Sequence, residues 1–375
     1  MTGPGEPTAT IQAPEDLAGL DEALASLPNS PAVFLLWPRE GAPYLAKTAL
    51  LRRRLLRLLA ERAKTSRLLN LRHTVARVDC WLTGSPLESM LAMYGLARRH
   101  FASNYLDVLR LRLPPYVKIV LDNRFPRSTV TRRIARAPAL YFGPFRSRAS
   151  AERFEGEFLN LFQIRRCEEE LAPAPDHPGC IYGEMGMCLR PCQLVVGEDE
   201  YSSEVGRASA FLSTRGRSLT ESVGQARERL SEEMNFEEAA KQHKRLERIE
   251  EVLKLCDELA SDIDRLSGVA VTRSPEPGAV ELRFVYKGWW QAAARFAVAP
   301  AAEGKSVSMD QRLRELAAER EMVTDSTRAR QEHLAILARW FYSSWREGEW
   351  LAFERLEDMS YRKLVRAISR VAASQ

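Results

Sequence analysis

The segment PAVFLLWPREGAPYLAKTALLRRRLLRLLAERA, residues 31–63, decides the fold class. Its apolar run Ala32–Trp37 predicts a short strand, and the turn-forming PREGAP separates that run from a second strand around Tyr44–Ala46. Leucines then recur at helical spacing with arginines on the other faces: Leu51, Leu55, Leu58 and Leu59. A β-hairpin followed by a basic amphipathic helix indicates a compact mixed domain.

The pattern continues after this segment. TVARVDCWL predicts another strand and Pro86–His100 another helix, which completes a ββαβα order. Further on, PPYVKIVLDNRFPRSTVTRRI alternates apolar and polar residues and predicts strands. Between Ser222 and Leu259 apolar residues recur at helical spacing, which indicates a helical hairpin broken at Asn235.

The last part predicts three short strands over VAVTRSPEPGAVELRFVYKGWWQAAARFAVAP, followed by polar helices that contain Trp340, Phe341, Trp345 and Trp350. Trp289, Trp290, Trp340 and Trp345 are candidates for stacking on bases, although we favour a core or interface role. The predicted fold class is therefore α+β in five regions: 1–20 a flexible leader, 21–110 a mixed α/β domain, 111–200 a basic and cysteine-rich region, 201–260 a helical hairpin, and 261–375 strands and helices.

Charge is distributed unevenly along the 375 residues, whose net charge is +5. Residues 1–153 carry 24 Lys and Arg against 12 Asp and Glu, whereas the remainder carries 31 against 38. A basic half of this kind is a plausible phosphate-binding surface, because it releases counterions from a nucleic-acid backbone. The candidates for DNA binding are Arg52, Arg53, Arg124, Arg127, Arg132, Arg133, Arg146 and Arg148, with Arg136, Arg165 and Arg166 nearby.

The chain lacks a long apolar span or a signal-like N-terminus, so we expect a cytoplasmic protein with no membrane contact. In a reducing compartment its six cysteines indicate a metal site rather than disulfides. Four of them lie within 26 residues among prolines and glycines: Cys167, Cys180, Cys188 and Cys192. Four thiolates can close around one metal centre, and their spacing allows either iron or zinc. Cys80 and Cys256 lie in strand and helix patterns, which are typical of core residues.

Three groups of motifs resemble the UvrC family of bacterial excinuclease proteins. The first is the hairpin and helix, which resemble a GIY-YIG nuclease module. Tyr44, Lys47, Arg54 and Glu88 stand at or near positions that would surround a scissile phosphate, so they are the candidate catalytic residues. Phe34 replaces an expected tyrosine, and in ESMLAMYGLARRH Met93 replaces the metal-binding glutamate. A thioether does not hold Mg²⁺, so this module is expected to be degenerate, with Mg²⁺ needed only if it is active.

The second group comprises YFGPFRSRASAERFEGEFLNLFQIRRC, HPGC and GMCLRPC, which resemble the family's cysteine region and imply a [4Fe–4S] cluster, with zinc as the alternative. The third is LSEEMNFEEAAKQHKRLERIEEVL, which resembles the UVR motif and implies pairing with a UvrB-like helicase through Phe236, Glu237, Ala239 and Ala240. Self-association of the hairpin, or its packing on the chain's own domain, is the alternative. The family's ribonuclease-H-like and helix-hairpin-helix domains would lie beyond the end of the chain.

The resemblance implies a role in nucleotide excision repair, and we expect a DNA-binding and UvrB-binding accessory with impaired nuclease activity. One alternative is an active structure-specific DNA endonuclease of the GIY-YIG type, which would hydrolyse phosphodiesters by excinuclease-type incision. Another is a pure interaction protein that competes for UvrB without binding DNA. The sequence leaves open which lesion is bound and whether the protein promotes or restrains repair.

Overall fold

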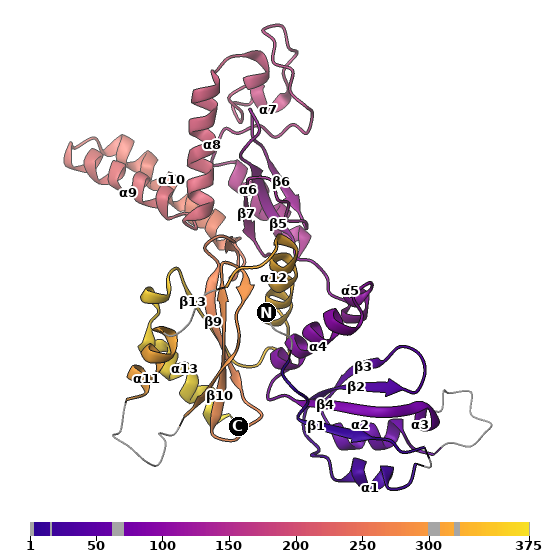
Figure 1. Ribbon diagram of the computed structural model, residues 1–375. Helices are drawn as coiled ribbons and strands as arrows, with labels where there is room; N and C mark the ends of the chain where they lie inside the picture. Colours follow the sequence, from indigo (N-terminus) through magenta and orange to yellow (C-terminus); the bar gives the residue numbers. More distant parts are fainter. Residues whose placement is uncertain (1–3, 16, 62–70, 299–307, 319–322, 375) are drawn as a thin grey trace.

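The computed structural model describes residues 4–374 except residue 16 and the segments 62–70, 299–307 and 319–322. Figure 1 shows an N-terminal sheet with helices, a middle region, an arm of two helices, and a C-terminal sheet with helices. The strands pair antiparallel throughout the described sheets, which confirms the predicted α+β class. In the described part of the chain, no helix is long and apolar enough to cross a membrane.

The N-terminal sheet has the strand order β1-β4-β2-β3. Its strand β2 is buried on both faces: Val33 and Leu35 pack with α4, whereas Phe34 and Leu36 pack with α1 and α2. Burial on both faces explains why this run is continuously apolar rather than alternating. The elements are β1 (Ala9–Gln12), α1 (Leu20–Ala25), β2 (Ala32–Pro38), β3 (Tyr44–Thr48), α2 (Leu51–Leu58), α3 (Leu71–Thr74), β4 (Val75–Leu82), α4 (Pro86–His100) and α5 (Tyr105–Leu109).

The expected flexible leader over residues 1–20 is partly wrong. Residues Ala9–Gln12 form β1, which pairs antiparallel with β4, and Ile11 is buried in the core beside α1. The pairing gives this segment the backbone partners that its composition did not reveal. Leu20, predicted to begin the first domain, begins α1.

The middle region is a sheet in the order β6-β5-β7-β8, packed against α6 and α8. Stacked and tilted phenylalanine rings fill this core, with Phe142, Phe154 and Phe158 at centroid separations of 5.2 and 6.1 Å. Strand β8 follows the helical arm in sequence and pairs with β7. The last strand of this sheet therefore comes from the predicted region 261–375. The elements are β5 (Tyr116–Val120), β6 (Ser128–Thr131), β7 (Ala139–Gly143), α6 (Arg148–Leu159), α7 (Ile181–Glu184), the 3₁₀ turn Pro191–Gln193, α8 (Glu198–Ser213) and β8 (Ser261–Asp262).

The arm consists of α9 (Arg217–Glu232) and α10 (Phe236–Lys254), which project away from the body in Figure 1. The chain turns between them near Asn235, as the sequence predicts, and the Asn235 side chain caps α10 by accepting a hydrogen bond from the Glu238 N–H. The base of the arm packs into the middle core through Val223, Leu246 and Ile249. Its outer half therefore remains exposed.

The C-terminal sheet has the order β11-β10-β9-β13, and β12 also pairs with β10. Helix α12 packs on one face through Leu334 and Leu337, and α13 packs on the other through Leu364 and Ile368. Of the tryptophans expected on helices, Trp345 follows α12 and Trp350 lies on β13. The elements are β9 (Ser267–Arg273), β10 (Ala279–Tyr286), β11 (Trp289–Trp290), β12 (Ala294–Ala297), α11 (Met309–Ala318), α12 (Thr327–Phe341), β13 (Glu349–Phe353), the 3₁₀ turn Leu356–Asp358 and α13 (Tyr361–Ala373).

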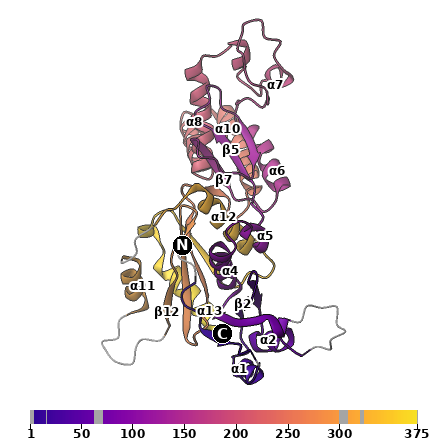
Figure 2. The same cartoon turned by 45° about the vertical axis from the view of Figure 1, so that its right-hand side comes forward.

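Helix α12 connects the three folded regions, and Figure 2 shows it between the middle sheet and the pair α4–α5. Its Glu332 carboxylate is buried and accepts hydrogen bonds from Tyr94 Oη at 2.6 Å and Tyr105 Oη at 2.5 Å. Gln331 Oε1 accepts a hydrogen bond from the Ile134 N–H of the middle region at 2.7 Å. On the other side, His333 Nδ1 accepts one from the Trp290 N–H at 3.1 Å.

The contact between Gly84 and the C-terminal sheet gives a test of this arrangement. A Cβ atom at Gly84 would lie 2.2 Å from the Ser274 carbonyl carbon and 2.5 Å from the Pro275 nitrogen. Gly84→Ala should therefore lower the free energy of unfolding by about 1–3 kcal/mol, because neither backbone atom can move aside easily. Urea unfolding measures the change.

Gly206→Ala is the matched control, since a Cβ atom at this α8 position meets nothing within 4 Å. It should stabilise the protein by roughly 0.5–1 kcal/mol, as alanine does in a helix. Equal effects of the two substitutions would contradict the close approach of the first domain to the C-terminal sheet.

Candidate nucleic-acid interface and metal centre

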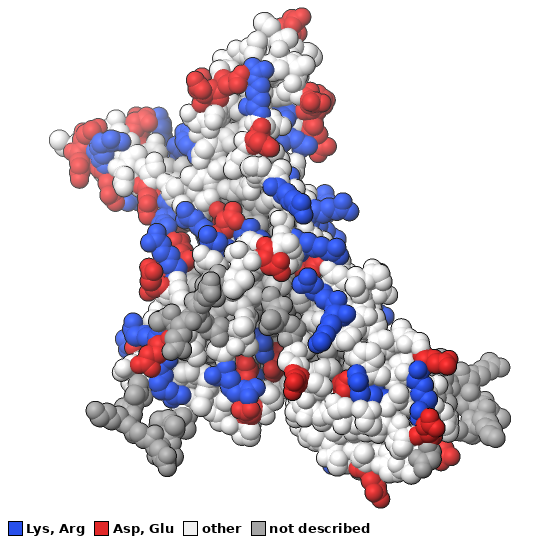
Figure 3. Space-filling model, viewed as in Figure 1, with Lys and Arg blue, Asp and Glu red and all other residues white. Residues whose placement is uncertain are grey.

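Basic side chains gather where the middle region meets α5 and α12, as Figure 3 shows. Of the arginines predicted to bind DNA, Arg132 and Arg133 are exposed and form no ion pair with a carboxylate in the described part of the chain. Arg124 pairs with Glu198, and Arg148 pairs with Glu152 at 2.6 Å. The remaining predicted positions are Arg52 and Arg53, exposed on α2, Arg127, half-buried, and Arg146, whose guanidinium lies 5.2 Å from the Tyr342 ring centroid.

Arg165, which we also considered for phosphate binding, is not available for that role. Its side chain is buried and donates hydrogen bonds to the carbonyl oxygens of Phe125 and Glu169, both at 2.8 Å. It also approaches Cys167 Sγ at 3.6 Å. Arg165 therefore anchors the start of the cysteine segment instead of facing solvent.

The four predicted metal ligands lie in the loop-rich segment between α6 and α8. Cys188 and Cys192 are buried, and Cys167 and Cys180 are half-buried. The pKa of Cys188 is raised to about 11, chiefly by burial and further by the charges of the other three thiols, while the Arg190 N–H at 3.4 Å from its Sγ opposes the shift. The four thiols are thus close enough to influence one another electrostatically.

This set of donors suits a thiophilic metal, because four sulfurs and N–H groups directed at two of them share one irregular segment. Among the described residues, however, no group of three or more His, Cys, Asp or Glu side chains is gathered closely enough to hold a metal ion. The chemistry of the ligands therefore fits a metal centre, whereas the geometry of a bound centre stays a prediction. Cys80 is fully buried in the N-terminal core as expected, and Cys256 is partly buried in the turn after α10, where it packs against the middle core.

The predicted partner-binding residues lie at the start of α10, near the tip of the arm. Phe236 is 66% exposed, and Met234 beside it is 75% exposed. Glu237 and Ala240 are exposed as well, whereas Ala239 is buried. Two large apolar side chains at the end of a projecting hairpin form a small apolar surface that the chain itself leaves uncovered.

The candidate catalytic positions follow the expected elements. Phe34 is buried in β2, and its ring centroid lies 6.3 Å from that of Tyr44, which is 43% exposed on β3. Lys47, near the end of the same strand, lines a cavity of about 890 Å³ between the first domain and the C-terminal sheet. Arg54 is half-buried on α2. Met93 packs against the core, so its thioether is part of the packing of α4.

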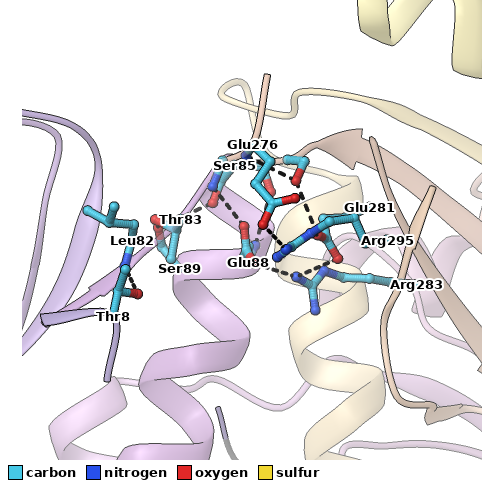
Figure 4. Close-up of polar contacts among 12 residues, drawn as sticks. Thr8, Leu82, Thr83, Ser85, Glu88, Ser89, Glu276, Glu281, Arg283 and Arg295 are labelled. Atoms are coloured by element: carbon cyan, nitrogen blue, oxygen red, sulfur yellow. Dashed lines mark hydrogen bonds and ion pairs between the residues drawn. The ribbon is translucent and has the colours of Figure 1, made fainter. Parts of the chain in front are cut away.

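Glu88 lies in the first turn of α4, where its backbone and side chain both serve the fold. Its N–H donates to Ser85 Oγ at 3.1 Å, and its Oε2 accepts from the Gly84 N–H at 2.7 Å. Its Oε1 pairs with Arg283 Nη2 of β10 at 2.9 Å. Figure 4 shows the carboxylate directed at this arginine. Burial raises the pKa of Glu88, and Arg283 opposes that shift.

The structure does not bring all of the catalytic candidates together. Glu88 lines a separate cavity of about 430 Å³ with Glu281, Arg283 and Arg295, whereas Lys47 lines the larger one. In the smaller cavity Arg295 donates from Nε to Glu281 at 2.9 Å, so its acids and bases largely neutralise one another. The carboxylate therefore faces its ion-pair partners and not the lysine.

Sequence reasoning missed Arg283, which pairs with Glu88, and did not place Trp345 near the first domain. Trp345, a candidate for base stacking, lies beside Lys47, whose Nζ is 5.7 Å from the centre of the indole ring. The alternation of Glu281 and Arg283 along β10 marked a polar face, but no sequence pattern indicated what it would contact. Trp290 and Trp340 are fully buried, as we favoured, whereas Trp345 is 39% exposed.

The fold and these sites define an α+β protein with a thiol-rich lobe and a projecting helical hairpin. Residues 115–211 match the family model described as "UvrC/Cho excinuclease, middle domain". The chain is 27% identical over 279 residues to the UvrABC system protein C of Desulfatibacillum aliphaticivorans, which covers 73% of this chain and 45% of that protein. It is 28% identical over 270 residues to the same-named protein of Moorella thermoacetica, covering 72% of this chain and 44% of that protein.

These matches confirm the resemblance to the UvrC family that the motifs indicated. The chain spans less than half the length of the curated relatives that it matches. No solved structure matches the chain.

The ion pair between Glu88 and Arg283 leads to a stability prediction. Both side chains are largely buried, with 16% and 12% of their surfaces exposed, so removing one leaves the other poorly solvated. Glu88→Gln should lower the free energy of unfolding by about 2 kcal/mol, and a double-mutant cycle with Arg283→Met should give a coupling energy of about 1–3 kcal/mol.

The exposed pair Arg370–Glu349, also at 2.9 Å, is the control cycle and should give a coupling below about 1 kcal/mol. If the two cycles gave the same small coupling, Glu88 would not be held by Arg283 and its carboxylate would be available for other chemistry.

Proposed function

We propose that this protein is a UvrC-like component of nucleotide excision repair that binds DNA and a UvrB-like partner, and whose N-terminal domain has lost phosphodiester cleavage. The repair role is supported by the relatives, which are UvrABC system C proteins, and by the UvrC-type middle region. The DNA-binding role is supported by the basic face in Figure 3, where Arg132 and Arg133 lack carboxylate partners among the described residues.

The observation that carries the loss of cleavage is the position of Glu88. Metal-assisted hydrolysis of a phosphodiester needs a carboxylate that holds a hard divalent cation near the scissile phosphate. Met93 and Phe34 supply neither a carboxylate nor a hydroxyl at the positions where the family resemblance places them. Glu88, the acid that remains, is hydrogen-bonded to Gly84 and paired with Arg283. Tyr44, Lys47 and Arg54 then remain as phosphate-binding groups.

For the cysteine segment we propose a metal centre held by Cys167, Cys180, Cys188 and Cys192. A cluster or zinc ion there would supply a structural crosslink in a segment whose regular structure is limited to one short helix and one 3₁₀ turn. The N–H groups of Arg165 and Arg190 that approach Cys167 and Cys188 are of the kind that stabilises metal-bound thiolate. The family resemblance favours [4Fe–4S].

The metal assignment predicts the composition of anaerobically purified protein. We expect iron and sulfide with broad absorption near about 400 nm, and loss of both in Cys188→Ser, because one thiolate ligand is removed. The control is Cys256→Ser, which changes a cysteine outside the segment and should retain the full metal content. Zinc in place of iron would keep the crosslink and exclude a cluster, and protein free of both metals would contradict the assignment.

For the hairpin we propose that its apolar tip pairs with a like hairpin of UvrB, because two helices alone leave Phe236 and Met234 uncovered. The alternative, a pure interaction protein that competes for UvrB, rests on this same exposed tip. Only the DNA-binding accessory predicts DNA affinity that falls with salt concentration, so a titration of DNA at several salt concentrations distinguishes the two.

The hairpin proposal predicts that Phe236→Ala weakens binding to a purified UvrB protein by about tenfold or more, since a large exposed aromatic is the kind of residue that dominates an interface. Isothermal titration calorimetry measures the affinity. Leu121→Ala is the control, because Leu121 is a 48%-exposed apolar residue of the middle region. Unchanged affinity in both variants would remove the tip of the hairpin from the interface.

A further inference from the structure

The exposed side of α12 carries basic residues at both of its ends. Arg328, in the first turn, is 70% exposed although its Nε pairs with Glu332 at 3.1 Å, and it lines a cavity of about 270 Å³ together with Arg136 of the loop between β6 and β7. Arg339, in the last turn, donates to the Leu109 carbonyl oxygen at 3.1 Å. In Figures 1 and 2 this helix lies between the middle sheet and α4–α5, so its arginines extend the basic face towards the first domain.

The far end of α12 leads to Lys47. Trp345, in the turn that follows the helix, is 39% exposed, and its ring centre lies 5.7 Å from Lys47 Nζ. Lys47 lines a cavity of about 890 Å³ together with Glu347, which follows Trp345 by two residues. Glu347 itself is paired with Arg273 and so does not neutralise the lysine. An exposed indole beside a cation is the combination with which proteins bind single-stranded nucleic acid.

Lys47 and Arg339 are held in one neighbourhood although both are cationic. The pKa of Lys47 is lowered, first by burial and then by the charge of Arg339, and no carboxylate among the described residues acts on it in the opposite direction. Arg339 is bonded to a neutral carbonyl oxygen rather than to an acid. Two cations kept together in this way favour an anion, because an anion relieves their mutual repulsion.

We propose that Lys47, Arg339 and Trp345 form a subsite for one nucleotide of a single-stranded nucleic-acid segment, with a phosphate between the two cations and a base stacked on the indole. This subsite rests on the proposed DNA-binding function and adds residues of the C-terminal region to it. Arg136 and Arg328 continue the same path, so the strand would run along α12 from the middle region to the first domain. The ligand needs no particular sequence, because stacking and phosphate contacts are sequence-tolerant.

The test uses the full chain and a fluorescein-labelled oligothymidylate, with binding followed by fluorescence anisotropy over a range of salt concentrations. Trp345→Leu should weaken binding about tenfold, whereas Trp345→Phe should retain most of the affinity because phenylalanine still stacks. Arg339→Gln should reduce the slope of log affinity against log salt by about 0.7, the value expected for one lost phosphate contact on a single strand.

Arg366→Gln is the matched control, since it removes the same charge from an exposed position of α13, on the opposite face of the C-terminal sheet. It should leave both the affinity and the slope unchanged, and thermal melts confirm that each variant is folded. If the unaltered protein bound the oligonucleotide but Trp345→Leu and Arg339→Gln behaved like this control, the subsite would be wrong and DNA binding would stand. If the unaltered protein bound neither this strand nor a duplex, both proposals would be wrong.

Discussion

The carboxylate of Glu332 is the group on which the arrangement of the whole molecule depends. A buried carboxylate is tolerated only when its oxygens are hydrogen-bonded, and Glu332 accepts from Tyr94 and Tyr105 and pairs with Arg328. Separating helix α12 from α4 and α5 would therefore break both tyrosine hydrogen bonds to this carboxylate. Because α12 also contacts Trp290 and the middle region, this one requirement fixes the first domain against the rest of the chain.

This contact between the domains determines where the cavities between them lie. The seam between the first domain and the C-terminal sheet contains two cavities, one with Glu88 and one with Lys47. The first is occupied by an ion-pair network with Arg283 at its centre, which satisfies the acid. The second is lined by Lys47, whose Nζ lies 5.7 Å from the ring centre of the exposed Trp345. Glu88, which catalysis could have used, thus forms an ion pair between two domains. Its partner Arg283 lies on β10, which is distant in sequence.

Local structure could be predicted from the sequence because local interactions determine it. The start of α4 follows from the Ser85 cap and a proline in the first turn, and the break before α10 follows from Asn235. Strands β1 and β8 could not be predicted, since each exists only through pairing with a strand far along the chain. The same holds for the site. Lys47 and Glu88 could be recognised from the sequence as candidate site residues, but their placement in two separate cavities depends on which C-terminal side chains contact them.

Binding and cleavage of a phosphodiester make different chemical demands on a protein. A phosphate group is bound by any well-placed cation, so Lys47 and Arg339 need no metal to attract a strand. Hydrolysis needs in addition a carboxylate that holds a divalent ion and a polarised nucleophile. Glu88 is already paired with Arg283 and hydrogen-bonded to the Gly84 N–H, so binding a metal ion would compete with both contacts. The proposed loss of cleavage and the proposed retention of binding would therefore both follow from the same domain contact.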